Sequence, residues 1–262
     1  MNNFIVLSKK EFVQMLRDYK LIWLPLIFIV LGITQPVVTL FLPSIIGSLG
    51  GETGITIDPS IYTQSGGEVL ASTFGSQFDQ LGLIILIIST MGIIHTDKVN
   101  GMLAFILTRP VNIISYISGK IIPNFLMASF GVLLGFFVSY LYVIYLFTHV
   151  SFSRMIIAML FYLVWVLFIV TFTTMISTIF NSQGIIAILS IAFLLGCRMI
   201  LGLNPSMDFV NPAIMSKNGM EVLTTGSISS SAAGNLFVTL IWVALILFVI
   251  NYWISNKKYI NR

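Results

Sequence analysis

The sequence predicts an all-α polytopic membrane protein that forms a single transmembrane domain over residues 1–262. The chain is 57% hydrophobic and only 8% charged, with a mean hydropathy of +1.02. A soluble domain of that composition would leave most of its surface apolar. Six apolar runs are each close to the length of about 20 residues that crosses a bilayer. The expected transmembrane helices span residues 21–42, 74–94, 121–147, 155–180, 185–203 and 236–254.

Residues 1–20 predict an amphipathic helix that lies along the inner leaflet ahead of the first span. Ser8 and Glu11 have the spacing of a capping box, in which two side chains satisfy free backbone N–H groups at a helix start. Apolar and cationic side chains then fall on different helix faces, as in interfacial helices. A plain basic flank that only sets topology is the alternative. The residues assigned to this helix are Lys10, Glu11, Phe12 and Arg17.

The second span is expected over 74–94, with Asp79 in its first turns and close to the outer surface. A register shifted toward residue 107 would bury Asp97 and Lys98 in the membrane, at about 3 kcal/mol each. The 74–94 register instead places both charges in a loop and leaves the spans without deeply placed acids. Transporters driven by ion gradients usually carry such acids near the bilayer centre, so this register disfavours them.

The segment 97–120 is the one interior loop that is both long and cationic. Its centre, 102–107, holds six apolar residues in a row, which need a protein or bilayer surface to cover them. Gly101 allows close approach to its backbone, and Pro110 ends the short helix that this run would form. We therefore expect the segment to dock a cytosolic protein. The residues assigned to docking are Asp97, Lys98, Gly101, Leu103, Ile106, Arg109, Pro110 and Lys120.

The positions of lysine and arginine predict the orientation of the chain. The N-terminal segment has four, segment 97–120 has three and the tail has three, and these ten fall on one side. The opposite side has only Arg154 and Lys217, together with five of the nine acidic residues. Because basic loops stay in the cytosol, we expect both termini and segment 97–120 there.

Two loops are expected on the exterior side. Residues 43–73 are rich in glycine and lack a cation, which predicts irregular structure. Residues 204–235 contain two Asn-Pro pairs, at 204–205 and 211–212, and this pair is a helix-start signal. The second pair predicts a short helix ending near Gly226. That segment either rests on the outer leaflet as a helix or is a surface loop with a few turns.

The sequence has no P-loop, no His-Glu-x-x-His pattern and no cluster of cysteine and histidine. We expect no enzyme activity, metal site or cofactor in this chain, and its scattered cations do not indicate nucleic-acid binding. The single cysteine, Cys197, excludes an intrachain disulfide. Arg198 is the one basic residue deep inside an expected span. Its side chain either reaches the outer headgroups or contacts an anionic or polar substrate group.

Segment 97–120 also resembles a known family. An acid at 97, glycine at 101, leucine at 103, Pro-Val at 110–111 and Gly-Lys at 119–120 have the spacing found in the permease subunit of type 2 ABC exporters. The opening Lys-Glu-Phe at 10–12, with Arg17, is similar to the first helix of that family. The match departs from the family at Asp97, where Glu is usual, at Met102, where Thr is usual, and at Ile113, where Arg is usual.

The resemblance implies a permease subunit that exports a hydrophobic or amphipathic substrate, such as a peptide antibiotic, a lipid or a drug. It implies a cytosolic coupling helix between spans two and three, bound by two ABC ATPase subunits that hold ATP and Mg²⁺. It also implies a second permease subunit, identical or related, in a prokaryotic plasma membrane. From the residues themselves two other classes stay open: a non-transporting immunity or sensor protein in the lipid bilayer, and an ion-coupled secondary transporter.

Overall fold

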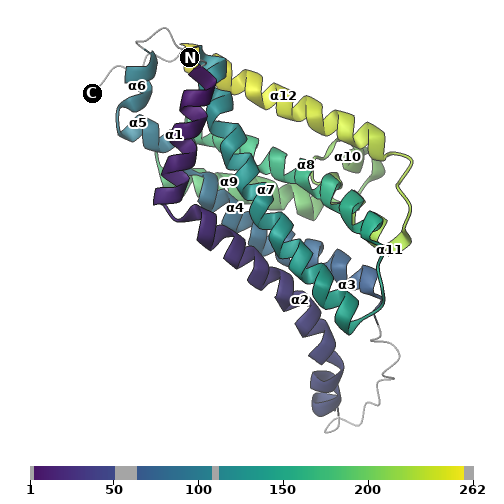
Figure 1. Cartoon of the computed structure of the whole chain (residues 1–262). Coiled ribbons are helices and arrows are strands. Elements are labelled where there is room, and N and C mark those ends of the chain that lie inside the picture. The colour runs from purple at the N-terminus through teal and green to yellow at the C-terminus, as the bar shows by residue number, and fades with distance from the viewer. Residues whose placement is uncertain (1–2, 51–63, 108–111, 257–262) are drawn as a thin grey trace.

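The computed structural model describes residues 3–50, 64–107 and 112–256, and within these ranges every regular element is a helix. Figure 1 shows the helices as an elongated bundle. The elements are α1 (Asn3–Arg17), α2 (Lys20–Gly50), α3 (Gly66–Ser72), η2 (Thr73–Gly82, a π-helix), α4 (Leu83–Thr90), α5 (Gly92–Val99), α6 (Met102–Leu107), α7 (Ile113–Leu146), α8 (Phe152–Ile179), α9 (Gln183–Ile200), α10 (Pro205–Val210), α11 (Ile214–Thr225) and α12 (Ala232–Asn256).

Among the residues that the structure describes, six helical stretches are long and apolar enough to cross a membrane, which confirms the predicted all-α polytopic class. They span Lys20–Ser44, Gly66–Val99, Ile113–Leu146, Phe152–Ile179, Gln183–Ile200 and Ala232–Asn256. The first, third, fourth, fifth and sixth each overlap the expected span. The second differs in register, and this difference changes how its charged residues are interpreted.

The second span runs over Gly66–Val99 and joins α3, η2, α4 and α5, so the predicted bounds 74–94 were too narrow at both ends. Its start is set by a capping box at Ser65 and Glu68, where each residue bonds the other's backbone N–H. The predicted irregular loop 43–73 was therefore wrong from Gly66 onward, and wrong also over residues 43–50, which belong to α2. Asp97 and Lys98 belong to the last turn of this span.

The capping box predicted at Ser8 and Glu11 was also wrong, because α1 begins at Asn3 and passes through both residues. The helix extends toward the N-terminus because its first turns pack along α7. There Gly119 has no side chain, and a Cβ at that position would lie 3.0 Å from Leu7 Cβ. Close approach at a glycine is a common means of packing helices in membranes.

Glycines also bring α2 against α7 over their middle turns. A Cβ added at Gly32 would lie 2.1 Å from the Gly135 carbonyl oxygen, and one at Gly135 would lie 2.3 Å from the Phe28 oxygen. Neither position tolerates a side chain without separating the two helices. Three stacked rings lie deeper in the bundle, with Phe74 between Phe136 and Tyr162 at centroid distances of 4.1 and 4.5 Å.

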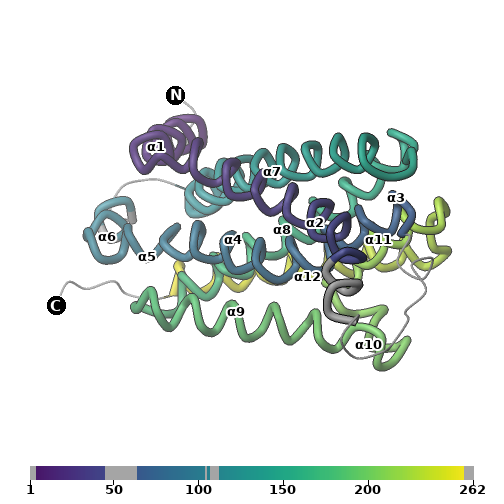
Figure 2. Tube along the Cα trace, turned by 90° about the horizontal axis from the view of Figure 1, so that it is seen from below, coloured from purple at the N-terminus to yellow at the C-terminus, as the bar shows by residue number. Residues whose placement is uncertain are grey.

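The two ends of the bundle carry different elements, as Figures 1 and 2 show. One end, which we call the α1 end, holds α1, α5, α6 and the last turns of α12. The other, which we call the α11 end, holds α3, α10 and α11. Segment 97–107 and the described parts nearest both termini thus share one end, as the distribution of basic residues predicts.

Both Asn-Pro pairs precede helices at the α11 end. Asn204 accepts a hydrogen bond from the Ser206 N–H, with Pro205 as the first residue of α10. The predicted helix after the second pair is confirmed as α11, which ends at the left-handed Gly226. It does not rest on lipid as a peripheral element: Val222 and Leu223 are buried, because α11 packs against α3 and α8.

Candidate functional site

Segment 97–107 forms the end of α5, a one-residue break and the short helix α6, so the predicted short helix is confirmed. The break is at Gly101, whose φ of +68° lies in the left-handed region that glycine adopts readily. The Gly101 N–H donates to the Lys98 carbonyl oxygen, and its own carbonyl accepts from the Phe105 N–H. A Cβ built on Gly101 would meet nothing within 4 Å, so its backbone is open to an approaching surface.

The apolar residues of this segment divide between the interior and the surface. Leu103 is buried at 1% exposure and Ile106 packs against the core, so both contact their own chain. Val99, Met102 and Phe105 are exposed, at 69%, 38% and 55%. We call these three the α6 patch. The sequence analysis assigned Leu103 and Ile106 to docking and not these three residues, although the spacing of three between Met102 and Phe105 places those two on one face of α6.

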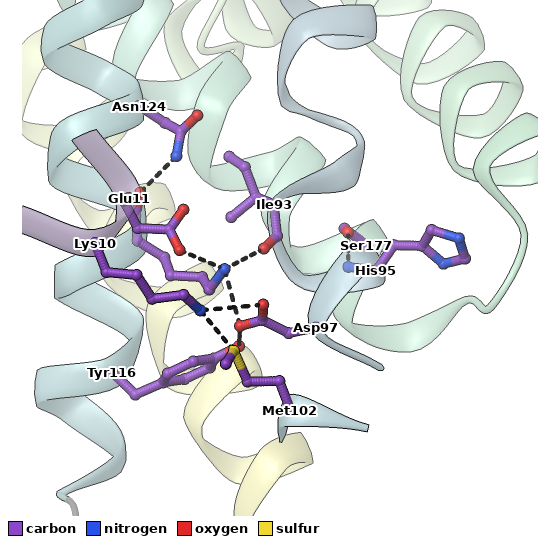
Figure 3. Close-up of polar contacts among 10 residues, drawn as sticks. Lys10, Glu11, Ile93, His95, Asp97, Met102, Tyr116, Asn124 and Ser177 are labelled. Carbon is purple, nitrogen blue, oxygen red and sulfur yellow. Dashed lines mark hydrogen bonds and ion pairs between the residues drawn. The ribbon is translucent and has the colours of Figure 1, made fainter. Parts of the chain in front are cut away.

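A buried ion cluster joins α1, α5 and α7 beside α6 (Figure 3). Lys120 Nζ lies 2.8 Å from Glu11 Oε1 and 2.9 Å from Asp97 Oδ2, and it donates to the Ile93 carbonyl oxygen at 2.8 Å. The Tyr116 hydroxyl donates to Asp97 Oδ2 at 2.9 Å. We call Glu11, Asp97, Lys120 and Lys10 the α1-end cluster.

The charges within this cluster balance. Glu11, Asp97 and Lys120 are each buried, and burial of an unpaired charge would be strongly unfavourable. Lys10, which is partly exposed, lies 3.7 Å from Asp97 Oδ1, so two ammonium groups face two carboxylates. Asp97 and Lys120 were predicted as docking residues and Lys10 and Glu11 as interfacial ones. The structure brings all four together and turns three of them inward.

Lys98, also predicted to dock a partner, is bonded within the chain. Its Nζ donates to the carbonyl oxygens of Thr178 and Phe180 at 2.9 and 2.6 Å, and to Asn181 Oδ1 at 3.2 Å. These carbonyls end α8, where a cation is favourable. The neighbouring Ser177 hydroxyl accepts from the His95 N–H at 3.0 Å, so α5 is attached to α8 at two points. Arg109 and Pro110 lie outside the described residues.

A groove of about 630 Å³ separates α1 from α5 and α6. Lys9, Lys10 and Arg17 line its α1 side, and Asn100 and Met102 line the opposite side. Phe12 is half-exposed and faces a different groove, on the α7 side of α1. Two residues assigned to the interfacial helix therefore line different grooves. Arg17 lines the groove that also contains Met102 of the α6 patch, and Phe12 lines the groove on the α7 side of α1.

A second ionic site lies inside the bundle, nearer the α11 end. Arg198 Nη2 is 2.9 Å from Asp79 Oδ2, and the Ser216 hydroxyl donates to the same oxygen. Asp79 is 1% exposed, and it lies in the π-helical segment η2, a backbone form that often marks functional positions. We call Asp79, Arg198 and Ser216 the η2 site.

The η2 site corrects two expectations. Asp79 is not near the end of its span, because that span starts at Gly66, so the spans do contain a buried acid. Arg198 neither reaches past the bundle to headgroups nor stands free for a substrate, since its guanidinium pairs with Asp79. The predicted second span over 74–94 placed Asp79 close to the outer surface, and for that reason the pairing with Arg198 was not foreseen. An acid and a cation on different spans are natural partners inside a membrane.

No protein-family model matches the chain. Over 253 residues it is 32% identical to a protein of Bacillus subtilis (strain 168) that bears the name "Uncharacterized transmembrane protein YxlG". The match covers 97% of this chain and 97% of that protein. The similarity thus extends over all six spans, and it agrees with a multi-pass membrane protein.

Proposed function

The chain belongs to the same family as the transmembrane protein YxlG, and we propose that it is the permease subunit of a type 2 ABC exporter. ATP and Mg²⁺ would be held by two separate cytosolic subunits. The observation that carries this proposal is the α6 patch. It presents apolar side chains at and just beyond the end of a membrane span, on the last turn of α5 and on α6, and Leu103 of α6 is buried against the rest of the chain. Such a surface calls for a protein partner.

The contacts behind the α6 patch would transmit a movement of α6 to α1, α7 and α8. A partner that moves α6 moves α5, and α5 is joined to α1 and α7 by the α1-end cluster. Through Lys98 it is also joined to the end of α8. A displacement of α6 would therefore tilt several spans together, as alternating access requires. Asp97, Lys98 and Lys120, which the sequence analysis assigned to docking, would instead connect the docking surface to the spans.

The groove beside the patch indicates the chemistry of the partner. Lys9, Lys10 and Arg17 line it together with Asp18 and Asp97, while Met102 and Val6 give it an apolar component. A complementary ATPase surface would present residues of both charges around an apolar centre. A second permease subunit, identical or related, would cover α9, which is the least buried of the six spans. The substrate would be hydrophobic or amphipathic, in keeping with apolar spans.

The test compares two short helices at opposite ends of the molecule. The chain is co-expressed with a P-loop ATPase sought among the neighbouring reading frames, and the ATPase is quantified after purification in mild detergent. Asp substitution of Met102 and Phe105 should reduce recovery of the ATPase, because losing an aromatic anchor costs about 2 kcal/mol, or roughly thirtyfold in affinity. The matched control is Asp substitution of Met207 and Phe209 in α10, also exposed on a six-residue helix.

Gly101 and Gly202 provide a second matched pair. Both have positive φ, at +68° and +91°, and a Cβ at either position would meet nothing within 4 Å. Gly101→Ala and Gly202→Ala therefore carry a similar backbone strain, of about 1 kcal/mol. Only Gly101→Ala should impair ATPase recovery or uncouple transport from hydrolysis. Equal behaviour within both pairs of variants would mean that α6 docks no ATPase.

The buried Asp79 favours a second candidate, an ion-coupled secondary transporter, because such carriers use acids within their spans. Arg198 weighs against it, since its guanidinium occupies one oxygen of the carboxylate that would otherwise meet a cation. Transport in vesicles separates the two. Uptake that continues without ATP and stops on addition of a protonophore would favour ion coupling, whereas uptake that requires ATP would favour the exporter.

A further inference from the structure

The groove on the α7 side of α1 shares Lys9 with the groove beside the α6 patch and is otherwise lined by different residues. It has a volume of about 660 Å³ and lies between α1, the start of α2 and the first half of α7. Figure 2 shows α1 at the periphery of the bundle, beside the beginning of α7. Apolar side chains form its walls, among them Phe12, Leu126 and Phe130, each between 46% and 60% exposed.

Two polar groups lie at the α1 side of this otherwise apolar groove. Lys9 is exposed and has no ion-pair partner among the residues that the structure describes. Ser8 also lines the groove, and its Oγ is buried without a hydrogen-bond partner in the same described ranges. Because the Ser8 oxygen is buried, it is not accessible from the groove, and Lys9 is the donor available to a ligand there. An ammonium donates to an anionic oxygen.

The long axis of the groove follows a membrane span. Ile122 and Phe130 both line it, and they are eight residues apart on α7, or about 12 Å at 1.5 Å per residue. Both belong to the span Ile113–Leu146. An occupant must therefore be apolar along the part within the bilayer and anionic only where it meets Lys9. A phospholipid has this arrangement, and basic pockets beside transmembrane helices bind anionic headgroups.

We infer that this groove binds an anionic phospholipid of the adjacent leaflet. One acyl chain lies between α1 and α7, against Leu126 and Phe130. The phosphate accepts a hydrogen bond from Lys9 Nζ. Bound lipid would hold α1 against α7 from the side opposite the α1-end cluster. This inference does not depend on the proposed exporter function, because it requires no ATPase.

Native mass spectrometry of the purified full-length chain tests the inference. The protein is titrated with phosphatidylglycerol and with phosphatidylcholine of identical acyl chains. We expect about fivefold tighter binding of phosphatidylglycerol, since a basic residue near an anionic group contributes about 1 kcal/mol. Lys9→Gln should abolish this preference, whereas Ser8→Ala should leave it unchanged, because Ser8 Oγ is not accessible from the groove. Because Lys9 is exposed, Lys9→Gln leaves the fold intact and remains informative whatever the other variants do.

A filling substitution tests the acyl-chain part. Leu126→Trp places a large side chain in the groove and should cause loss of both bound lipids. Leu133→Trp is its control, being 41% exposed on α7 but outside the groove lining. Equal binding of the two lipids by the parent protein would overturn the inference. So would a preference that survives Lys9→Gln, or a dimer that forms as lipid is lost, which would assign the groove to a second copy of the chain.

Discussion

The α1-end cluster and the η2 site are both buried ionic sites, but they are built differently. In the α1-end cluster, Lys120 lies between two carboxylates, and Lys10, Tyr116 and the Ile93 carbonyl provide further partners. In the η2 site a single guanidinium, that of Arg198, faces a single carboxylate, that of Asp79. The first site has redundant contacts where helices meet at one end of the bundle. The second has one ion pair within a span, with the Ser216 hydroxyl as a further partner of Asp79, so loss of Arg198 leaves the carboxylate without a cation.

The largest effect is expected at the η2 site. Arg198→Gln leaves the fully buried Asp79 carboxylate without a cation, and breaking a buried ion pair costs about 3–5 kcal/mol. The thermal unfolding midpoint of the purified protein in detergent should fall markedly. Adding Asp79→Asn to this variant should recover part of the loss, because no unpaired charge remains. A double variant that is as unstable as the sum of the single ones would show that the two residues do not interact.

A smaller loss is expected in the α1-end cluster. Lys120→Met removes the central ammonium and, with it, the ion-pair partner that the described residues give Glu11, but Lys10 remains 3.7 Å from Asp97 and Tyr116 continues to donate to Asp97. We expect destabilisation of about 2–3 kcal/mol, measured by the same thermal unfolding. Lys9→Met is the control, since exposed substitutions away from such clusters change stability by about 0.5 kcal/mol or less. If Lys120→Met lowered stability more than Arg198→Gln, redundancy would not explain the difference between the two sites.

The smallest effect concerns Asp208 at the α11 end, outside the spans. The Gly202 N–H donates to its carboxylate at 2.9 Å, and this bond, with Lys217 at 3.1 Å, lowers the pKa of Asp208 below its ordinary value. A lowered folded-state pKa means that the contribution to stability is complete above the ordinary value near 4, and is lost as pH falls through the lowered one. A surface contact of this kind contributes about 1 kcal/mol or less.

Thermal unfolding of the parent and of Asp208→Asn should therefore differ by a constant, small amount between pH 5 and about 8. The difference should shrink below about pH 4 as the carboxylate is protonated. A difference that grew on acidification would mean that Asp208 is held in its protonated form by the fold, contrary to its contacts.

Much of the architecture followed from composition and local pattern. Apolar run length predicted six spans, basic residues predicted which segments share an end, and the Asn-Pro pairs predicted the starts of α10 and α11. The short helix after Gly101 was predicted from six consecutive apolar residues. Each of these features depends on the free energy of transferring single residues between water and lipid, or on contacts within a few residues. Both can be judged from the local sequence.

The sequence by itself thus determined the class of the protein, the number of its spans and the segment that leaves the membrane between spans two and three. Only the tertiary structure decided that Asp97 and Lys120 face inward, that Phe105 rather than Leu103 faces outward, and that Arg198 pairs with Asp79. The physical reason is that the free energy of a buried charge depends on its partner. Glu11, Asp97 and Lys120 come from three separate helices, and Asp79 and Arg198 from two spans, so no local pattern specifies these pairings.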